Sequence, residues 1–263
     1  MPGTNLILRR DNMVCYPGMG LTIEQKRKKL YHYTSFDSFV KIWLSKKLLF
    51  NDVSYVNDVY ESNFSMRMHS LNSLNFTNDF KRCRKEYKQV SLTMRYDSYM
   101  DGDMSPAMWG IYGRSGKGVC IELDYDKLDL TGTIQSEIFY EDPLPLPPSL
   151  DEITDIDKID DFILQHQREL LFTKHKSWQF ENEFKILKRD CQEYEGVNIE
   201  AAITAVTVAK WKEPEPQFVL QLLENEHEIA VNYFHTDFRV ELEQTILVKE
   251  DLPSFIDRMT EMK

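Results

Sequence analysis

Segments with strand-like and helix-like patterns of apolar residues follow one another along this chain without regular alternation, and this order constrains the fold most strongly. Runs rich in aromatic and β-branched residues, typical of strands, occur at Leu30–Thr34, Gln89–Met94, Val119–Leu123, Phe184–Lys188 and Ile203–Val208. Apolar residues at helical spacing predict a helix between the first two runs, at residues 36–46. A doubly wound α/β sheet needs regular alternation of strand and helix. We therefore predict the α+β class.

Composition and the placement of proline and glycine set the expected domain boundaries. The chain has 263 residues, of which 42% are hydrophobic, and this is enough for one large core. Residues 1–22 hold two prolines and three glycines without a sustained period, which predicts a loosely ordered arm before a single α+β domain at residues 23–263. Further helical segments are expected at Tyr60–Lys88, Asp151–Leu171 and Pro214–Asn225.

Charge and cysteine spacing exclude several classes of protein. The formal net charge of −11 opposes non-specific attraction to nucleic acid or anionic lipid. The longest apolar stretches, such as Leu48–Phe50, fall far short of the roughly 20 residues of a membrane-spanning helix. The N-terminal sequence also lacks the apolar core of a secretory signal. The four cysteines show no zinc or disulfide spacing. We expect a cytoplasmic protein with no membrane partner and no metal.

Two parts of the sequence carry candidate chemistry, and the first is a histidine within the earliest strand. His32 stands between Tyr31 and Tyr33, so its ring is expected on the sheet face opposite to both tyrosines. A lone histidine in a strand is more often a hydrogen-bonded structural residue than a functional one. A functional role for His32 therefore depends on which other side chains lie beside its ring.

The second part is a pair of acids, Glu181 and Glu183, directly before an apolar strand. In extended geometry their carboxylates would project from one face about 6–7 Å apart. The two negative charges repel each other unless a cation, or a positive charge that develops during a reaction, lies close to both. The oxocarbenium-like transition state of glycosidic cleavage is one such charge. The alternative is an exposed strand edge whose acids pair with Lys185 or Lys188.

The other candidate site residues can also be explained as purely structural residues. Trp109 and Tyr112 at helical spacing, and Trp178 before the acids, are more often core residues than pocket walls. The polar loop at residues 57–61 suits a binding loop as well as a turn. The basic run Lys81–Lys85 is either a solvated helix face or a local channel for nucleic acid. No glycine-rich dinucleotide or P-loop motif and no His-Glu-x-x-His motif occurs.

The order of these motifs resembles a bacterial family of unknown function. That family has a Tyr-His-Tyr-Thr-Ser start, an Asn-Asp-Pro-x-Glu loop, a Trp-x-x-Tyr helix and a Trp-x-x-Glu-x-Glu-x-Arg segment. The matching residues here are Tyr31 to Ser35, Asn57, Asp58 and Glu61, Trp109 and Tyr112, and Trp178, Glu181 and Glu183. The likeness spans about residues 30–245. Val59 stands where the family has the proline of its loop. Lys185 stands where the family has the arginine, so the bidentate geometry of arginine is lost.

This family is similar to ADP-ribosyltransferases in its order of an early-strand histidine and a late glutamate. The resemblance implies a mixed, mostly antiparallel sheet of the split-sandwich kind with peripheral helices, and NAD as the substrate. It also implies that His32, Tyr33 and Thr34 lie at NAD, that Glu183 is the catalytic carboxylate and that Glu181 faces the acceptor. Tyr60, Trp109 and Tyr112 are the alternatives for the ring that stacks on nicotinamide.

The implied function is an NAD-dependent ADP-ribosyltransferase that modifies a macromolecule, RNA or DNA rather than protein. Such an enzyme would act as a toxin or phage-defence effector, with a neutralising antitoxin protein as a partner. One alternative is an NAD glycohydrolase that uses the same site. A second is a non-catalytic binding or regulatory module whose motif residues are structural. A nuclease is disfavoured because no clustered acidic metal site is apparent in the sequence.

Overall fold

The computed structural model describes residues 28–52, 57–58, 73–95, 105–153, 155–209, 223, 229–234 and 240–241. The predictions for the arm at residues 1–22 and for Tyr60 lie outside this part. The predicted helix at 214–225 also lies outside it, apart from Leu223, which is helical.

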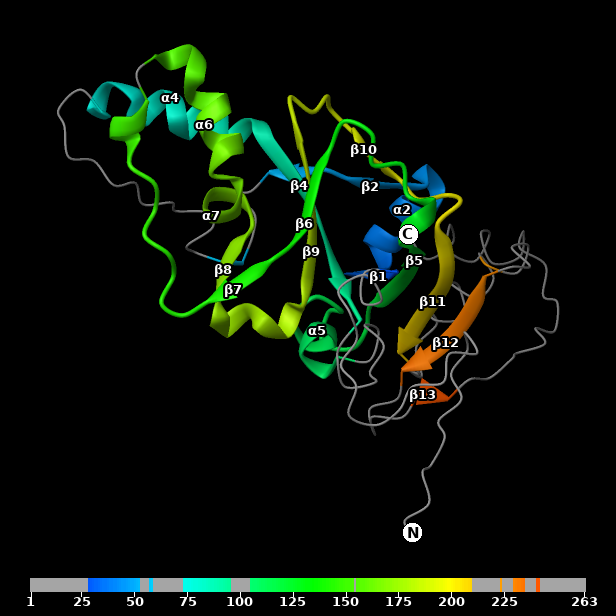
Figure 1. Ribbon diagram of the computed structural model, residues 1–263. Helices are drawn as coiled ribbons and strands as arrows, with labels where there is room; N and C mark the ends of the chain where they lie inside the picture. Colours follow the sequence, from blue (N-terminus) through cyan, green and yellow to red (C-terminus); the bar gives the residue numbers. More distant parts are fainter. Residues whose placement is uncertain are drawn as a thin grey trace, which may run out of the picture.

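A nine-stranded sheet organises the described residues (Figure 1), with strand order β13-β12-β11-β5-β1-β4-β9-β6 and with β3 paired to β4. Its strands are β1 (Lys29–Thr34), β3 (Asn51–Asp52), β4 (Tyr87–Met94), β5 (Val119–Asp124), β6 (Ile134–Glu137), β9 (Glu183–Arg189), β11 (Ile203–Ala209), β12 (Ala230–Phe234) and β13 (Val240–Glu241). Within this sheet β11 and β12 are parallel, and every other pairing is antiparallel. The predicted α+β class with a mixed, mostly antiparallel sheet is confirmed.

Two small sheets and several helices complete the described fold. β2 (Lys47–Leu49) pairs with β10 (Gly196–Asn198), and β7 (Phe139–Glu141) pairs with β8 (Thr173–His175). The α-helices are α2 (Phe36–Ser45), α4 (Ser73–Glu86), α5 (Pro106–Ile111), α6 (Ile159–Gln165) and α7 (Gln167–Leu171). Short 3-10 helices are η3 (Tyr125–Lys127), η4 (Leu150–Glu152), η5 (Ile156–Lys158) and η6 (Lys176–Glu181). No helix in the described ranges is long and apolar enough to span a membrane.

The single helix predicted for Asp151–Leu171 is wrong, because the structure divides this range into η4, η5, α6 and α7. The side chains of Ser149 and Asp155 accept hydrogen bonds from the backbone two residues further on, and each begins a short turn. Such local bonds compete with a continuous helix. The predicted apolar positions are nevertheless buried, as at Ile159 and Phe162. The helix predicted to extend to Lys88 ends at Glu86, and β4 begins at the next residue.

Alternation along the central strands sends apolar side chains to both faces of the sheet. On one face, Leu92 of β4 and Ile186 of β9 pack with Phe39 of α2 in the largest core cluster. On the other face there are two separate clusters. One joins α4, α6 and α7 to the β4–β9 side of the sheet, and the other joins α5 to Tyr31 and Tyr33 of β1.

Polar residues of β4 and β9 stand on the face that carries these two separate clusters. Gln89, Ser91 and Thr93 alternate with buried apolar residues of β4, and Glu183 and Lys185 do the same on β9. Backbone pairing between β1 and β4 is limited to Leu30 and Tyr31. The core is thus interrupted beside β1, and this interruption positions the candidate site.

Candidate active site

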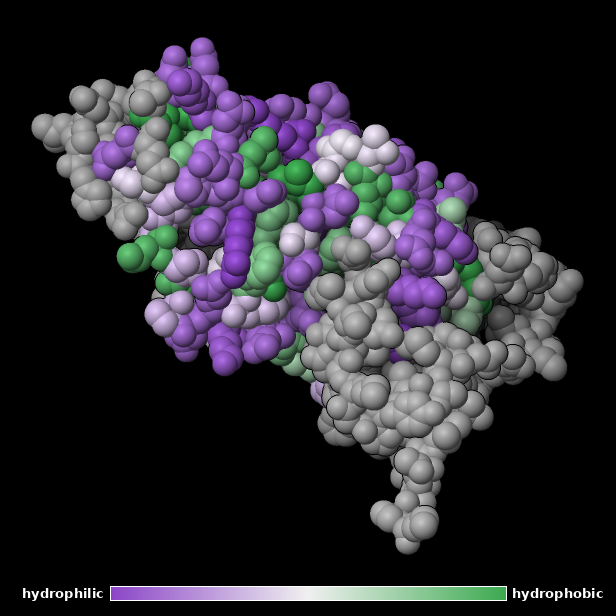
Figure 2. Space-filling view, in the orientation of Figure 1, coloured by the Kyte–Doolittle hydropathy of each residue, from purple (hydrophilic) through white to green (hydrophobic). Residues whose placement is uncertain are grey.

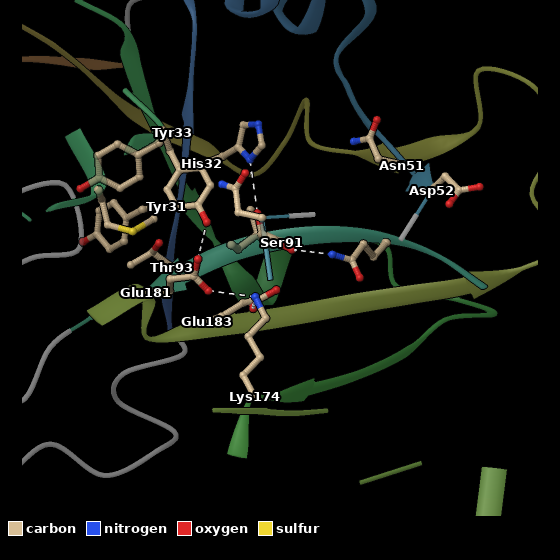
Figure 3. A pocket seen from close by; sticks show the side chains of 15 residues that line it. Tyr31, His32, Tyr33, Asn51, Asp52, Ser91, Thr93, Lys174, Glu181 and Glu183 are labelled. Carbon is tan, nitrogen blue, oxygen red and sulfur yellow. Dashed lines mark hydrogen bonds and ion pairs between the residues drawn. The ribbon is translucent and has the colours of Figure 1, made fainter. Parts of the chain in front are cut away.

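A cavity of about 390 Å³ opens at this interruption of the core. Its volume lies in the range of roughly 300–1,000 Å³ that is usual for small-molecule sites. The lining residues are Tyr31, His32, Tyr33, Asn51, Asp52, Asn57, Gln89, Ser91, Leu92, Thr93, Met108, Tyr112, Lys174, Glu181 and Glu183. Figure 3 shows side chains from β1, β3, β4, β8 and β9 converging on one space. The cavity therefore combines residues that lie far apart in the sequence.

A buried lysine joins the two predicted acids. Lys174 Nζ lies 2.9 Å from Glu181 Oε2 and 2.6 Å from Glu183 Oε2. The three residues are 6%, 4% and 3% exposed, so the charges are almost removed from water. Because both oxygens contact the same nitrogen, they lie within about 5.5 Å of each other. Lys174 thereby holds both carboxylates at one end of the cavity (Figure 3).

The predicted extended geometry of the Glu181–Glu183 segment is wrong. Glu181 ends η6, Asn182 adopts the left-handed conformation with φ of 44°, and Glu183 begins β9. Asn182 Nδ2 donates to the carbonyl oxygens of Met94 and Arg95, which fixes this turn against the end of β4. The acids therefore converge through a turn and an ion pair. The exposed-edge alternative also fails, since β9 lies between β4 and β6 and Glu183 is buried.

The environment moves the pKa values of the two acids apart. Burial by itself would raise the pKa of Glu183, but the charges of Lys174 and Lys185 outweigh it and hold this pKa well below its usual range. Burial and then repulsion by Glu183 raise the pKa of Glu181, even though Lys174 opposes both effects. Glu183 is therefore the carboxylate that stays ionised, and Glu181 is the one that takes up a proton first.

Tyr112 binds the second oxygen of Glu181. Its hydroxyl donates a short hydrogen bond to Glu181 Oε1. Burial and the charge of Glu181 raise the pKa of Tyr112, so the phenol keeps its proton and remains a donor. The hydroxyl oxygen of Tyr140 accepts the backbone N–H of Glu183 at 2.9 Å. Tyr112 thus holds the carboxylate of Glu181, and Tyr140 holds the backbone at Glu183.

His32 contributes a neutral ring. Its Nδ1 lies 3.4 Å from the carbonyl oxygen of Ser91, and a carbonyl accepts only, so this contact places the proton on Nδ1. Burial lowers the pKa of His32, which keeps the ring uncharged near neutral pH. Nε2 is then a hydrogen-bond acceptor. The ring reaches the cavity at the point where the backbone pairing of β1 and β4 has ended.

The remaining predicted residues divide into two groups. Tyr33 and Tyr112 line the cavity, together with Asn57 from the predicted polar loop. Trp109 is 1% exposed and packs edge-on against Tyr33 with ring centroids 5.3 Å apart, so it lies in the core outside the lining. Thr34 at the end of β1 is likewise not a lining residue. Trp178 packs against Phe180 with tilted rings and is not a lining residue.

Sequence reasoning missed Lys174 and the polar face of β4. Nothing in the local sequence separates Lys174 from the neighbouring Lys176, because the difference is burial. The residues Gln89, Ser91 and Thr93 did carry a signal. They alternate with apolar residues over the predicted strand, and a period of two marks one polar face.

The basic run Lys81–Lys85 lies on α4, and three of its residues line a second hollow of about 600 Å³. The hollow is lined by Asn78, Lys81, Arg82, Lys85, Glu86, Lys88, Asp190 and Cys191. Figure 2 shows that the surface around α4 and α6 is mostly hydrophilic. Among the described residues, no group of three or more His, Cys, Asp and Glu side chains is arranged to hold a metal ion.

Comparisons with known proteins match the chain to a family model and to solved structures. A model of the family described as "Protein of unknown function (DUF2971)" matches residues 108–186, a range that includes five cavity residues. No curated protein matches the chain. Among solved structures, the chain is similar to Thermus sp. 2.9 DarT in complex with ADP-ribosylated ssDNA. The likeness has 13% sequence identity and a TM-score of 0.36, and it covers 81% of this chain and 96% of that chain.

Proposed function

We propose that this protein is an NAD-dependent ADP-ribosyltransferase that modifies a macromolecule. The observation that carries the proposal is that the ionised Glu183 and the neutral His32 line the same cavity. Cleavage of the bond between nicotinamide and ribose develops positive charge on the ribose ring. A carboxylate held beside that ring stabilises the charge as it forms.

Each lining group has a role in this reaction. Nε2 of His32 accepts a hydrogen bond from a ribose hydroxyl, which orients the sugar. Glu183 accepts from the ribose and faces the developing charge. Tyr33 and Tyr112 offer aromatic rings against which nicotinamide packs. Glu181, with its raised pKa, suits a group that takes a proton from the attacking acceptor.

Nucleic acid is the proposed acceptor, and the protein is proposed to act in the cytoplasm as a toxin or phage-defence effector with a neutralising partner. The support for nucleic acid is local. Lys81, Arg82 and Lys85 of α4 line one hollow on a chain whose net charge is −11. A cluster of cations attracts a phosphate backbone even where the overall charge opposes it.

Hydrolysis of NAD is the second candidate, and one observation favours it. Both oxygens of Glu181 are already engaged, Oε1 by Tyr112 and Oε2 by Lys174. A carboxylate held in this way is less free to receive the proton of a macromolecular acceptor. Water would then take the ADP-ribosyl group, because Glu183 alone suffices to stabilise the oxocarbenium charge.

The test is to incubate the purified protein with labelled NAD and a mixture of bacterial RNA, DNA and protein, beside a Glu183→Gln variant. We expect label on nucleic acid with the unchanged protein and a loss of at least about 100-fold in the variant, because electrostatic stabilisation is removed. Glu141→Gln is the matched control, since Glu141 pairs with Arg168 outside the cavity.

The outcomes separate the candidates. Free nicotinamide without any labelled macromolecule would establish the hydrolase. Turnover in Glu183→Gln equal to that of the Glu141→Gln control would remove Glu183 from the chemistry. Neither binding nor turnover of NAD by the folded protein would overturn both reactions and leave a binding or regulatory module.

A further inference from the structure

The carboxylate of Glu181 is held by two donors of different kinds. Lys174 binds Oε2 at 2.9 Å and also binds Glu183 at 2.6 Å, so releasing this oxygen would disturb a buried ion pair (Figure 3). Tyr112 binds Oε1 through a neutral hydroxyl. Its side chain is only half-buried, and it lines the cavity. Oε1 is therefore the oxygen that a group entering the cavity can reach at the lower cost.

Two packed elements bring the Tyr112 hydroxyl to this oxygen. Tyr112 is the residue that caps the C-terminus of α5, where its backbone N–H donates to the carbonyl of Met108. Glu181 is the last residue of η6. Tyr112 and Phe180, the residue before Glu181, both pack against the cluster of buried residues that includes Trp109. The hydroxyl and the carboxylate are thereby held against each other by the fold, before any ligand binds.

The hydrogen bond from Tyr112 weakens Glu181 as a base. A donor to a carboxylate stabilises its charged form and so lowers its affinity for a proton. Burial and the charge of Glu183 raise the pKa of Glu181, and the hydrogen bond from Tyr112 opposes them. The same hydroxyl also occupies one side of Oε1, where an acceptor group would otherwise lie. Tyr112 therefore restrains both the strength of this base and the access to it.

The two fates of the ADP-ribosyl group depend on Glu181 to different degrees. In both, the bond between nicotinamide and ribose breaks, its electron pair leaves with nicotinamide, and Glu183 faces the charge left on the ribose. In transfer, an oxygen or nitrogen of the acceptor bonds to the ribose carbon and its proton passes to Glu181. In hydrolysis, water forms that bond and its proton passes to the solvent. A weaker and less accessible Glu181 therefore slows transfer more than hydrolysis.

We propose that Tyr112 is a positioning residue that sets how the ADP-ribosyl group is divided between a macromolecular acceptor and water. Its hydroxyl holds Oε1 of Glu181, and the acceptor competes with this hydroxyl for the carboxylate. The role belongs to the hydroxyl and is separate from the packing of the Tyr112 ring against nicotinamide. This inference rests on the proposed function.

The experiment measures the ratio of labelled macromolecule to free ADP-ribose, with labelled NAD and a limiting amount of bacterial RNA, DNA and protein, so that both products form. Tyr112→Phe keeps the ring and removes the hydroxyl. We expect the ratio to rise by about three- to tenfold, because a hydrogen bond to a charged group is lost. Tyr194→Phe, which removes an exposed hydroxyl outside the cavity, should keep the ratio of the unchanged protein. A ratio of two products does not depend on the amount of folded enzyme.

A second pair of variants tests whether Tyr112 acts through Glu181. Glu181→Gln should lower the ratio, and adding Tyr112→Phe to Glu181→Gln should not change it further. A general disturbance of the cavity by phenylalanine would instead change the ratio in both backgrounds. The pH profile gives a further measurement. The ratio falls as the pH falls through the pKa of Glu181, and in Tyr112→Phe this fall should begin at a higher pH, because the bond that lowers the pKa is absent.

An unchanged or lower ratio in folded Tyr112→Phe would overturn the role of Tyr112 and leave the cleavage of NAD standing. An equal rise in the Glu181→Gln background would overturn it too. If Tyr112→Phe does not fold by circular dichroism, Tyr112→Leu provides the comparison, and its ratio should also rise. Release of nicotinamide without any labelled macromolecule, by both the unchanged protein and the Tyr112 variant, would overturn the inference and leave hydrolysis. Absence of nicotinamide release by the unchanged protein would overturn the proposed function as well.

Discussion

Lys174 is the residue on which the electrostatics of the cavity most depend. Its ammonium group contacts one oxygen of Glu181 and one of Glu183, and all three groups are buried. Two carboxylates that share a site without a cation cannot both stay ionised at low cost. Lys174 is therefore a positioning residue, which keeps Glu183 charged and fixed where a ribose would lie.

Replacing Lys174 by methionine keeps the length of the side chain and removes its charge. We expect the free energy of unfolding at neutral pH to fall by about 3 kcal/mol, since two buried carboxylates lose their counter-ion. Urea denaturation measures this. The control is Lys176→Met, an exposed lysine two residues away, which should change stability by less than about 0.5 kcal/mol. Equal effects of the two substitutions would show that Lys174 does not hold the acids.

At the scale of elements, the junction between η6 and β9 sets the direction of Glu181. The junction depends on Asn182, whose left-handed backbone reverses the chain and whose side chain binds the carbonyls of Met94 and Arg95. Asparagine tolerates this conformation better than most residues. One residue thus joins the end of the 3-10 helix, the start of β9 and the end of β4.

Two substitutions at Asn182 separate its roles. Alanine loses both hydrogen bonds and disfavours the left-handed backbone, so we expect a loss of about 2–3 kcal/mol in stability. Glycine restores the backbone freedom and loses only the hydrogen bonds, so its loss should be about 1 kcal/mol smaller. Thermal and urea unfolding of both variants measure the difference. A glycine variant no more stable than the alanine variant would mean that the backbone conformation matters little.

At the scale of the whole molecule, buried titratable groups link stability to pH. An unfolded histidine takes up a proton as the pH falls below about 6.5, whereas burial of His32 lowers its pKa in the folded state. The unfolded state then binds more protons, and stability falls as the pH falls. The lowered pKa of Glu183 adds a further loss that begins below its ordinary value of 4.5.

Comparison of the unchanged protein with His32→Asn between pH values of about 7.5 and 5.5 isolates the contribution of His32, because Glu181, whose pKa is raised, is present in both proteins. We expect His32→Asn to lose less stability than the unchanged protein over this range. Gln135→Asn, which changes an exposed side chain outside the cavity, should keep the slope of the unchanged protein. Urea unfolding at the two pH values measures all three proteins. Identical slopes for the unchanged protein and His32→Asn would show that folded His32 titrates as it does in the unfolded chain.

The sequence by itself determined the α+β class and most central strands, because periodicity depends on neighbours within one element. It also singled out His32, Tyr33, Tyr112, Glu181 and Glu183, which the cavity brings together. It did not determine where a helix is interrupted. The division of residues 151–171 arises from side chains of Ser149 and Asp155 that compete for backbone donors over two residues.

Only the tertiary structure decided which polar residues meet. Lys174 and Lys176 look alike in the sequence, yet only Lys174 is buried between two carboxylates, and burial is a property of the whole chain. The pKa values of Glu181 and Glu183 diverge for the same reason. Gln89 lines the cavity because β4 carries it to a place where other lining residues come from distant segments. Contacts of this kind depend on long-range packing, which local pattern does not specify.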